Sequence, residues 1–203
     1  MQHKLLKLTL LALLTWAAVP TLNAQTAHVG DILCEGNLIY PPSTYPASGA
    51  TAIGVVFYVD QTGQHGWAVA LQDAGSYTWG CGSDMPLPNY GNKRQAIYDL
   101  DGYENTRIVR ENCTNSPAFY AVDFENGWYV PALGQLNYLY GNLVEVNASL
   151  QVAGGTPFGN GSWLYWSSTE SSSNYAWYLS SSGELDSYRS KNTSWRVRGV
   201  RAF

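Results

Sequence analysis

Residues 175–203 read YAWYLSSSGELDSYRSKNTSWRVRGVRAF, and the alternation at the start of this stretch decides the fold that we expect. Side chains of a strand point alternately to its two faces, so Tyr175, Trp177 and Leu179 share one face and the residues between them share the other. The first set is large and apolar, and the second ends in Ser180. The pattern predicts a strand with a core face and a solvent face.

The rest of this tail is expected to complete a sheet. Residues 181–184 (SSGE) supply a turn, residues 185–190 (LDSYRS) a returning strand and residues 195–203 a final strand. Serine is enriched from residue 162 to 194, as in a linker, but tryptophans are spread through the same stretch and flexible linkers lack such large anchors. We therefore expect an ordered C-terminal antiparallel sheet that presents Ser, Tyr, Asn, Asp and Arg side chains to solvent.

Two strands are expected well ahead of the tail. The β-branched run 52–59 (AIGVVFYV) predicts a buried strand, and residues 66–71 (GWAVAL) return from a turn as its hairpin partner. Residues 72–116 have little periodicity, so we interpret them as long loops around a short helical piece near residues 94–98.

Two short helices are expected between these strands and the tail. Leucines and a tyrosine recur at helical spacing from residue 133 to 143, with Pro131 in the first turn. A second helix is expected over residues 145–152, ended by Gly154 and Gly155. The predicted fold class is α+β, with two short helices and a C-terminal antiparallel sheet.

The N-terminus has the layout of an export signal. Residues 1–24 place Lys4 and Lys7 ahead of an apolar run that is too short to span a bilayer, and Ala24 suits cleavage. We expect an N-terminal extension over residues 25–50 and one domain over residues 51–203. The mature protein is predicted to be periplasmic, on the cell surface or extracellular, with no membrane span.

Charge and cysteine content narrow the function classes. The chain carries 11 Lys and Arg against 15 Asp and Glu. Removal of the signal takes two lysines away and makes the balance more acidic, which argues against binding to nucleic acid. In an oxidising compartment two of Cys34, Cys81 and Cys113 are expected to pair, and Cys81–Cys113 is one of three pairings that the sequence leaves open.

No cofactor or metal is expected. The chain has no CxxC motif, and only His28 and His65 remain after the signal, which argues against a zinc site. Asp99, Asp101 and Glu104 resemble the start of a calcium loop, but the later ligand positions lack the required Glu. We interpret these three carboxylates as part of a solvated turn.

An ordered series of motifs carries a family resemblance over about residues 50–203. The motifs are GWYVPA (127–132) with the helix that follows it, YWSSTE (165–170), Ala176-Trp177, and VRGVRAF (197–203). They resemble the bacterial Lcl C-terminal domain family and its "major paralogous" relatives, which are similar to C-type-lectin-like folds. The resemblance implies a secreted or surface binding module. The Glu-Pro-Asn and Trp-Asn-Asp motifs of calcium-dependent lectins are absent, so it implies neither calcium nor a sugar site here.

A narrower resemblance concerns the variable proteins of diversity-generating retroelements, which share this fold. Their adenine-directed diversification of Asn codons yields residues such as Asn, Ser, Tyr, Asp, Thr, Arg and Gly, but never Lys, Gln, Glu, Met or Trp. The positions of the tail that fit this rule form the candidate ligand-binding face: Asn174, Tyr175, Tyr178, Ser180, Ser182, Asp186, Ser187, Tyr188, Arg189, Ser190, Asn192 and Ser194.

Within this face we expect Tyr178 and Tyr188 to be the anchors and Arg189 the charged contributor, because tyrosine offers a large, stiff contact surface. The expected scaffold consists of Trp128, Trp166, Glu170, Trp177 and Arg198. Glu170 is expected to hydrogen-bond a loop or to pair with an arginine at position 196, 198 or 201.

An enzyme is not expected. The fold likeness includes the formylglycine-generating enzymes, but neither Cys81 nor Cys113 has an evident base beside it, and a disulfide explains them more simply. No GxSxG, HExxH or P-loop motif occurs. The sequence thus predicts an exported, non-catalytic, adhesin-like module that binds a protein or glycan on another cell, host or phage surface. The alternative is an ordinary secreted lectin-like structural or adhesin domain without diversification.

Overall fold

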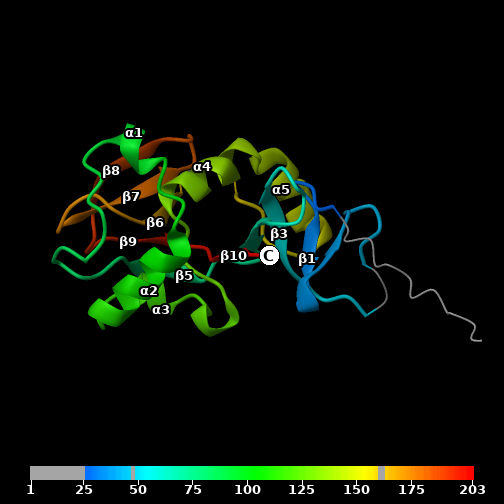
Figure 1. Ribbon diagram of the computed structural model, residues 1–203, viewed down its shortest axis with the longest axis horizontal. Helices are drawn as coiled ribbons and strands as arrows, with labels where there is room; N and C mark the ends of the chain where they lie inside the picture. Colours follow the sequence, from blue (N-terminus) through cyan, green and yellow to red (C-terminus); the bar gives the residue numbers. More distant parts are fainter. Residues whose placement is uncertain (1–25, 47–48, 160–162) are drawn as a thin grey trace, which may run out of the picture.

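The β-branched run predicted as a buried strand forms β3 (Ala52–Val59), which pairs antiparallel with β4 (Gly66–Ala70) as expected. The computed structural model describes residues 26–46, 49–159 and 163–203, without the side chains of Ser187 and Tyr188. The expected signal segment, residues 1–24, lies outside this range. Within it the chain has an α+β fold with two five-stranded sheets (Figure 1).

Sheet A has the strand order β10-β4-β3-β1-β2, and all its pairs are antiparallel. Its remaining strands are β1 (Ile32–Cys34), β2 (Leu38–Tyr40) and β10 (Val200–Ala202). Strands β1 and β2 come from the stretch that we expected to be an N-terminal extension. Ile32 and Leu33 of β1 are fully buried, so this stretch contributes to the same sheet and core as the domain behind it.

Sheet B has the order β5-β9-β6-β7-β8. Its strands are β5 (Gly75–Thr78), β6 (Leu164–Glu170), β7 (Tyr175–Ser180), β8 (Leu185–Ser190) and β9 (Ser194–Val197). Strands β7 and β8 form the hairpin predicted from the tail. The sheet is nevertheless mixed, because β9 inserts between β5 and β6 and runs parallel to β6, so the expectation of a purely antiparallel sheet was wrong.

The last nine residues were predicted as one strand, but they form two. Strand β9 ends at Val197 in sheet B, and β10 begins at Val200 in sheet A. Between them the Ala70 amide donates to the Gly199 carbonyl (2.9 Å) and the Arg198 guanidinium donates to the Ala70 carbonyl (2.8 Å). The C-terminal run therefore joins the two sheets, as the red segment of Figure 1 shows.

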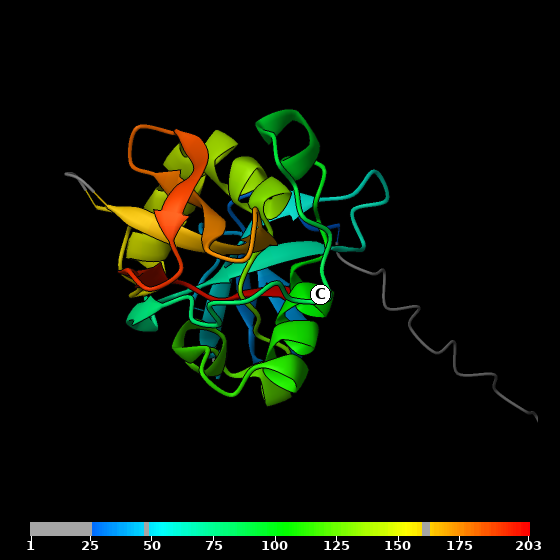
Figure 2. The same cartoon turned by 90° about the vertical axis from the view of Figure 1, so that its left-hand side faces the viewer.

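The helices lie on both sides of sheet B (Figures 1 and 2). Helix α4 forms where the leucine spacing predicted it, and α5 forms where the second short helix was expected. Helix α4 packs on β3, β6 and β7, whereas α2 and α3 pack on β6 and β5 from the other side. The full set is α1 (Lys93–Ala96), α2 (Gly102–Asn112), α3 (Pro117–Tyr120), α4 (Leu133–Gly141) and α5 (Leu143–Val152), with 3-10 turns η1 (Glu35–Asn37) and η2 (Phe124–Asn126).

Two details of the helix prediction need correction. Helix α2 lies in the stretch that we expected to form long loops. Its buried side includes Asn105, Thr106 and Val109 and so lacks an apolar repeat, which is why the sequence pattern did not predict it. The expected count of two short helices was therefore too low. Pro131 also lies just ahead of the first turn of α4, whose N-cap is Ala132.

Strand β7 is largely buried on both faces, which overturns its predicted solvent face. Trp177 and Leu179 belong to one apolar cluster, under α4 and α5, while Ala176 and Tyr178 belong to a second cluster on the side of α2 and α3. The predicted alternation of β7 side chains between two faces was correct, but the face that was expected to be exposed to solvent packs largely against other parts of the chain.

The disulfide pairs Cys81 with Cys113, one of the three pairings that the sequence left open. It ties the loop after β5 to the residue that follows α2. Cys34 is a buried free thiol on β1, and burial raises the pKa of that thiol.

Candidate functional site

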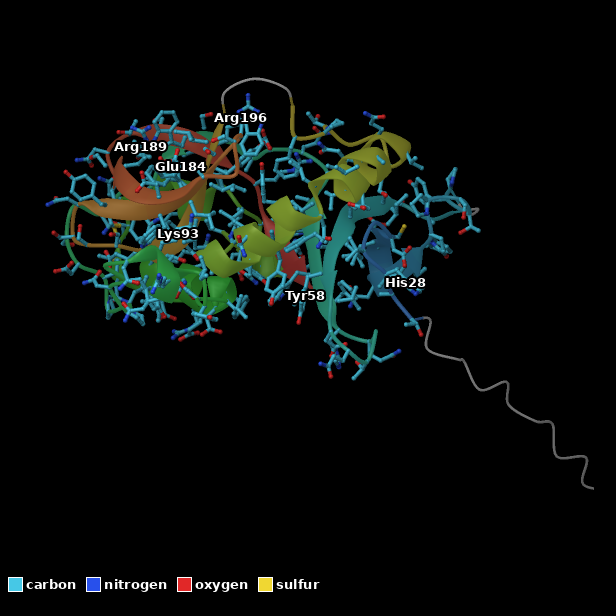
Figure 3. The ribbon with its side chains drawn as sticks, turned by 90° about the horizontal axis from the view of Figure 1, so that it is seen from above. His28, Tyr58, Lys93, Glu184, Arg189 and Arg196 are labelled. Atoms are coloured by element: carbon cyan, nitrogen blue, oxygen red, sulfur yellow. A yellow bond between two sulfur atoms is a disulfide. The ribbon has the colours of Figure 1, made fainter. Side chains whose placement is uncertain are left out.

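A cavity of about 530 Å³ lies on sheet B, and each of the five strands contributes to its lining. We call it the sheet B cavity. Figure 3 shows its charged residues Glu184, Arg189 and Arg196 gathered at one end of the molecule, away from His28 and Tyr58 of the sheet A end.

Five of the residues predicted to bind ligand line this cavity. They come from three strands and one turn, and they are Tyr178, Ser180, Ser182, Arg189 and Ser194. The pairing of β7 with β8 brings the first four together, and β9 brings the last.

Other predicted positions lie outside the lining. Asn174, Tyr175, Asp186, Ser190 and Asn192 are not among the cavity residues, although Tyr175 is exposed on β7. The side chains of Ser187 and Tyr188 lie outside the described part of the chain, so the expected Tyr188 anchor stays a prediction.

Tyr178 is placed differently from the prediction. Its side chain is only 2% exposed and packs in the second apolar cluster, so it forms the floor of the cavity rather than a protruding anchor. Ser180 is also buried. Burial raises the pKa of the Tyr178 hydroxyl, which favours its neutral form.

Seven lining residues were not among the predicted ligand-binding positions: Ser76, Trp163, Leu164, Ser181, Glu184, Trp195 and Arg196. Ser76 enters because β5 pairs with β9, a contact between residues far apart in sequence. Trp195 and Glu184 belong to residue types that adenine-directed diversification does not produce, so the rule that selected the candidate positions excluded them. The enrichment of serine around Ser181 was a usable signal, but nothing local marks Ser76.

Arg189 lies over the aromatic floor. Its guanidinium carbon is 5.4 Å from the centroid of the Tyr178 ring and 5.7 Å from that of the Trp195 ring, within the range of a cation–π contact. The side chain as a whole is exposed. This arrangement holds a charged group in a defined place while leaving it open to a ligand.

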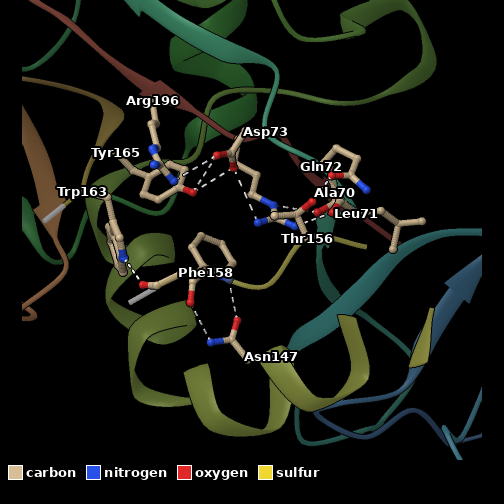
Figure 4. Close-up of polar contacts among 12 residues, drawn as sticks. Ala70, Leu71, Gln72, Asp73, Asn147, Thr156, Phe158, Trp163, Tyr165 and Arg196 are labelled. Atoms are coloured by element: carbon tan, nitrogen blue, oxygen red, sulfur yellow. Dashed lines mark hydrogen bonds and ion pairs between the residues drawn. The ribbon is translucent and has the colours of Figure 1, made fainter. Parts of the chain in front are cut away.

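The second guanidinium group at the cavity, that of Arg196, forms an ion pair with the carboxylate of Asp73 (Figure 4). Arg196 lies 3.5 Å from Asp73, which also accepts hydrogen bonds from the Tyr165 hydroxyl (2.8 and 3.0 Å). The buried Arg198 reaches the other oxygen of Asp73 (3.5 Å), and its burial lowers the pKa of its guanidinium. Arg198 thus acts as scaffold, as predicted, by joining Asp73 to the end of β4.

Glu170 has a different cation partner from those expected. Its carboxylate pairs with the ammonium of Lys191, and the two side chains are 0% and 1% exposed. The backbone N–H of Met85 also donates to it (3.1 Å), so the expected loop contact is confirmed while the arginine partner was wrong. Burial raises the pKa of Glu170 and the neighbouring Lys191 opposes that rise.

Two of the tryptophans expected in the scaffold lie in the apolar core. Trp166 and Trp177 are buried, and their indole N–H groups donate to the carbonyls of Tyr77 (3.0 Å) and Tyr90 (2.9 Å). The first bond joins two strands of sheet B, β6 and β5, and the second attaches the loop that carries Tyr90 to β7. Trp128 is half-buried and lines a smaller cavity of about 320 Å³ on another part of the molecule.

We expected Asp99 to lie in a solvated turn, and this expectation was wrong. Asp99 is buried and accepts hydrogen bonds from Thr169 Oγ1 (2.8 Å) and Asn105 Nδ2 (2.9 Å). The Leu133 amide in turn donates to Thr169 Oγ1 (2.8 Å), which fixes the start of α4 on β6. Glu104 pairs with Arg107 on the exposed side of α2.

Among residues 26–46, 49–159 and 163–203, no group of three or more His, Cys, Asp and Glu side chains is arranged to hold a metal ion. In the same ranges, no helix combines the length and the apolar character needed to cross a membrane.

The fold has a counterpart of known structure. A crystal structure of a fimbrial protein from Bacteroides ovatus ATCC 8483 matches it with a TM-score of 0.66 at 19% sequence identity, over 87% of this chain and 49% of that chain. The chain therefore spans about half the length of that protein, and at this identity the likeness concerns the fold alone. No protein-family model and no curated protein matches the sequence, so the Lcl resemblance rests on its motifs.

Proposed function

We propose that this protein is an exported, non-catalytic, adhesin-like binding module that takes a ligand in the sheet B cavity. The observation that carries the proposal is the convergence of Tyr178, Ser180, Ser182, Arg189 and Ser194 on one cavity. The sequence predicted these residues as ligand-binding positions, and they come from three strands and one turn. A volume of about 530 Å³ is within the usual range of ligand sites.

The chemistry of the lining supports binding rather than catalysis. Serine hydroxyls donate and accept hydrogen bonds, and Arg189 lies over the rings of Tyr178 and Trp195. Binding surfaces commonly combine rigid aromatic groups with adaptable polar ones. The expected ligand is a protein or glycan on another cell, host or phage surface. Similarity in fold to a fimbrial protein supports a location at the cell surface.

The backing of the cavity supports a preorganised site. Trp166 joins β6 to β5, Trp177 attaches the loop that carries Tyr90, and the Glu170–Lys191 pair joins β6 to the turn after β8. A site held on strands loses less conformational entropy when ligand binds than one on mobile loops.

The finer proposal is a C-type-lectin-like domain whose tail is diversified by a retroelement. Its support is the tail composition and the placement of five candidate positions in one cavity. Sequencing the gene's neighbourhood tests it: a nearby non-coding repeat that differs only at adenines, beside a reverse transcriptase gene, is the expected result. A locus without either contradicts diversification and leaves the ordinary adhesin-like module.

The main experiment is a binding screen with a blocked cavity. The exported protein is screened against a glycan array and a panel of purified surface proteins, alongside the variant Ser182→Trp, which places an indole in the cavity. The matched control is Val144→Trp, because Val144 on α5 is 80% exposed and does not line the cavity. Binding should be lost in Ser182→Trp and kept in Val144→Trp, with similar melting temperatures. A screen without any binder, or a binder indifferent to Ser182→Trp, contradicts the proposal.

A further inference from the structure

The sheet B cavity differs in charge from the chain around it. The whole sequence has a formal charge of −4. The cavity lining contains two guanidinium groups, Arg189 and Arg196, and one carboxylate, Glu184. An acidic protein that gathers cations at one cavity favours an anionic ligand there.

The two guanidinium groups are not equivalent. Arg196 already lies 3.5 Å from Asp73, and Tyr165 donates to the same carboxylate. Arg189 instead lies over the neutral rings of Tyr178 and Trp195 and also interacts with the Tyr178 hydroxyl. A guanidinium on aromatic faces keeps its N–H edge available for a planar, two-oxygen acceptor. Arg189 is therefore the cation best placed to hold a ligand carboxylate.

Serine hydroxyl groups line the same cavity as this cation. Ser180 and Ser182 share a hydrogen bond between their side-chain oxygens (2.8 Å), and the Glu184 amide donates to Ser180 (3.0 Å), so this pair is held in place. Ser76 and Ser194 lie exposed on the paired strands β5 and β9. Serine hydroxyls both donate and accept, and so do the hydroxyls of a sugar ring.

We propose that the sheet B cavity binds an acidic sugar residue of a glycan, with Arg189 holding the sugar carboxylate and the lining serines its hydroxyls. This inference rests on the proposed function, because it specifies the ligand of the same cavity. A sugar is favoured over the carboxyl terminus of a peptide because the cavity combines serine hydroxyls with aromatic rings, which suit the hydroxyl groups and the apolar face of a sugar ring.

The test uses two probes that differ only at one carbon. Methyl glucuronide carries a carboxylate where methyl glucoside carries a hydroxymethyl group, and both are titrated into the exported protein and followed by NMR shifts. The glucuronide should bind about tenfold tighter or more, because a charge-assisted hydrogen bond is stronger than a neutral one. A short alanine peptide with a free or an amidated carboxyl terminus is the competing ligand.

Variants assign the preference to one side chain. Arg189→Ala should remove the difference between the two glycosides, and Arg189→Lys should restore only part of it, since an ammonium lacks the planar fork. The control Arg107→Ala removes an exposed guanidinium on α2 and should change nothing. Equal binding of the glycosides, no binding of the glucuronide, a preference that survives Arg189→Ala, or tighter binding of the free peptide each overturns the inference.

The two proposals fail in different ways. If the screen yields a neutral ligand that Ser182→Trp excludes while the glucuronide does not bind, the cavity is a binding site and only the acidic-sugar assignment is wrong. If Ser182→Trp affects no ligand at all, the cavity itself is not the site and both proposals are wrong.

Discussion

Two polar regions of sheet B, built largely from the same serine-rich tail, have opposite environments. At one, Glu170 and Lys191 are enclosed together under the loop that carries Met85, with the Lys191 ammonium 4.4 Å from the centroid of the Trp79 ring. At the other, Arg189 and the serines face an open cavity. A charge in the tail is structural where a distant loop covers it and available for binding where none does.

The largest effect is expected at the enclosed region. Lys191→Met leaves the Glu170 carboxylate buried without its cation and should lower the free energy of unfolding by about 3–5 kcal/mol. Urea denaturation measures the loss. Because burial raises the pKa of Glu170, the loss should shrink as pH falls and the carboxyl group takes up a proton.

Two controls separate this pair from ordinary surface charges. The double variant Glu170→Gln/Lys191→Met should recover part of the stability, because it removes both buried charges. Arg107→Ala breaks exposed ion pairs to Glu104 and Glu111 and should leave the denaturation midpoint nearly unchanged. Equal effects of Lys191→Met and Arg107→Ala would show that the two regions do not differ as described.

A second prediction tests where the cavity floor ends and its rim begins. Tyr178→Ala removes a buried ring from the second apolar cluster and should cost about 3 kcal/mol of unfolding free energy. Ser182→Ala on the exposed rim should stay within about 0.5 kcal/mol. Thermal and urea unfolding of the two variants give the comparison. A Tyr178→Ala protein as stable as the parent would mean that this tyrosine is a surface anchor after all.

A third, smaller effect per residue is expected in alkali. Burial raises the pKa of both Tyr165 and Tyr129 to about 12. Since the folded pKa exceeds the ordinary value of 10.0, the stability that each hydroxyl contributes is fully present below pH 10 and is lost as pH rises towards 12. The loss is roughly 2 kcal/mol for each tyrosine at pH 12.

Ultraviolet titration of tyrosine ionisation, run beside unfolding measurements, tests this loss. The Tyr165 and Tyr129 hydroxyls should be among the last to ionise, together with unfolding, and Tyr165→Phe should remove one of them. Complete ionisation near pH 10 in a protein that remains folded would contradict the burial of these two hydroxyls.

Local patterns gave the elements that depend on apolar periodicity. Strand β7 and helix α4 were predicted from a regular apolar repeat and β3 from its β-branched run, whereas β4, β8 and α5 were predicted with the help of the turn residues beside them. Helix α2 was not predicted, because Asn105 and Thr106 occupy its buried side and form hydrogen bonds instead of apolar contacts. Strands β1, β2 and β5 are three or four residues long, too short to establish a period.

The candidate site was only partly predictable for a related reason. Residue type selected Ser180, Ser182, Arg189 and Ser194 correctly as cavity residues, and it selected Asn174 and Asn192 on the same grounds although they lie elsewhere. Residue type could not identify Ser76, because its position in the cavity depends on the pairing of β5 with β9.

The sequence by itself determined that the tail is ordered, that its strands alternate, and which side chains are polar, because these follow from local spacing and residue chemistry. Only the tertiary structure decided that both faces of β7 are covered, that Lys191 rather than an arginine neutralises Glu170, and that β9 and β10 belong to different sheets. Each of these depends on which distant segment packs against a given residue. Burial and charge pairing are properties of such contacts, so no local pattern encodes them.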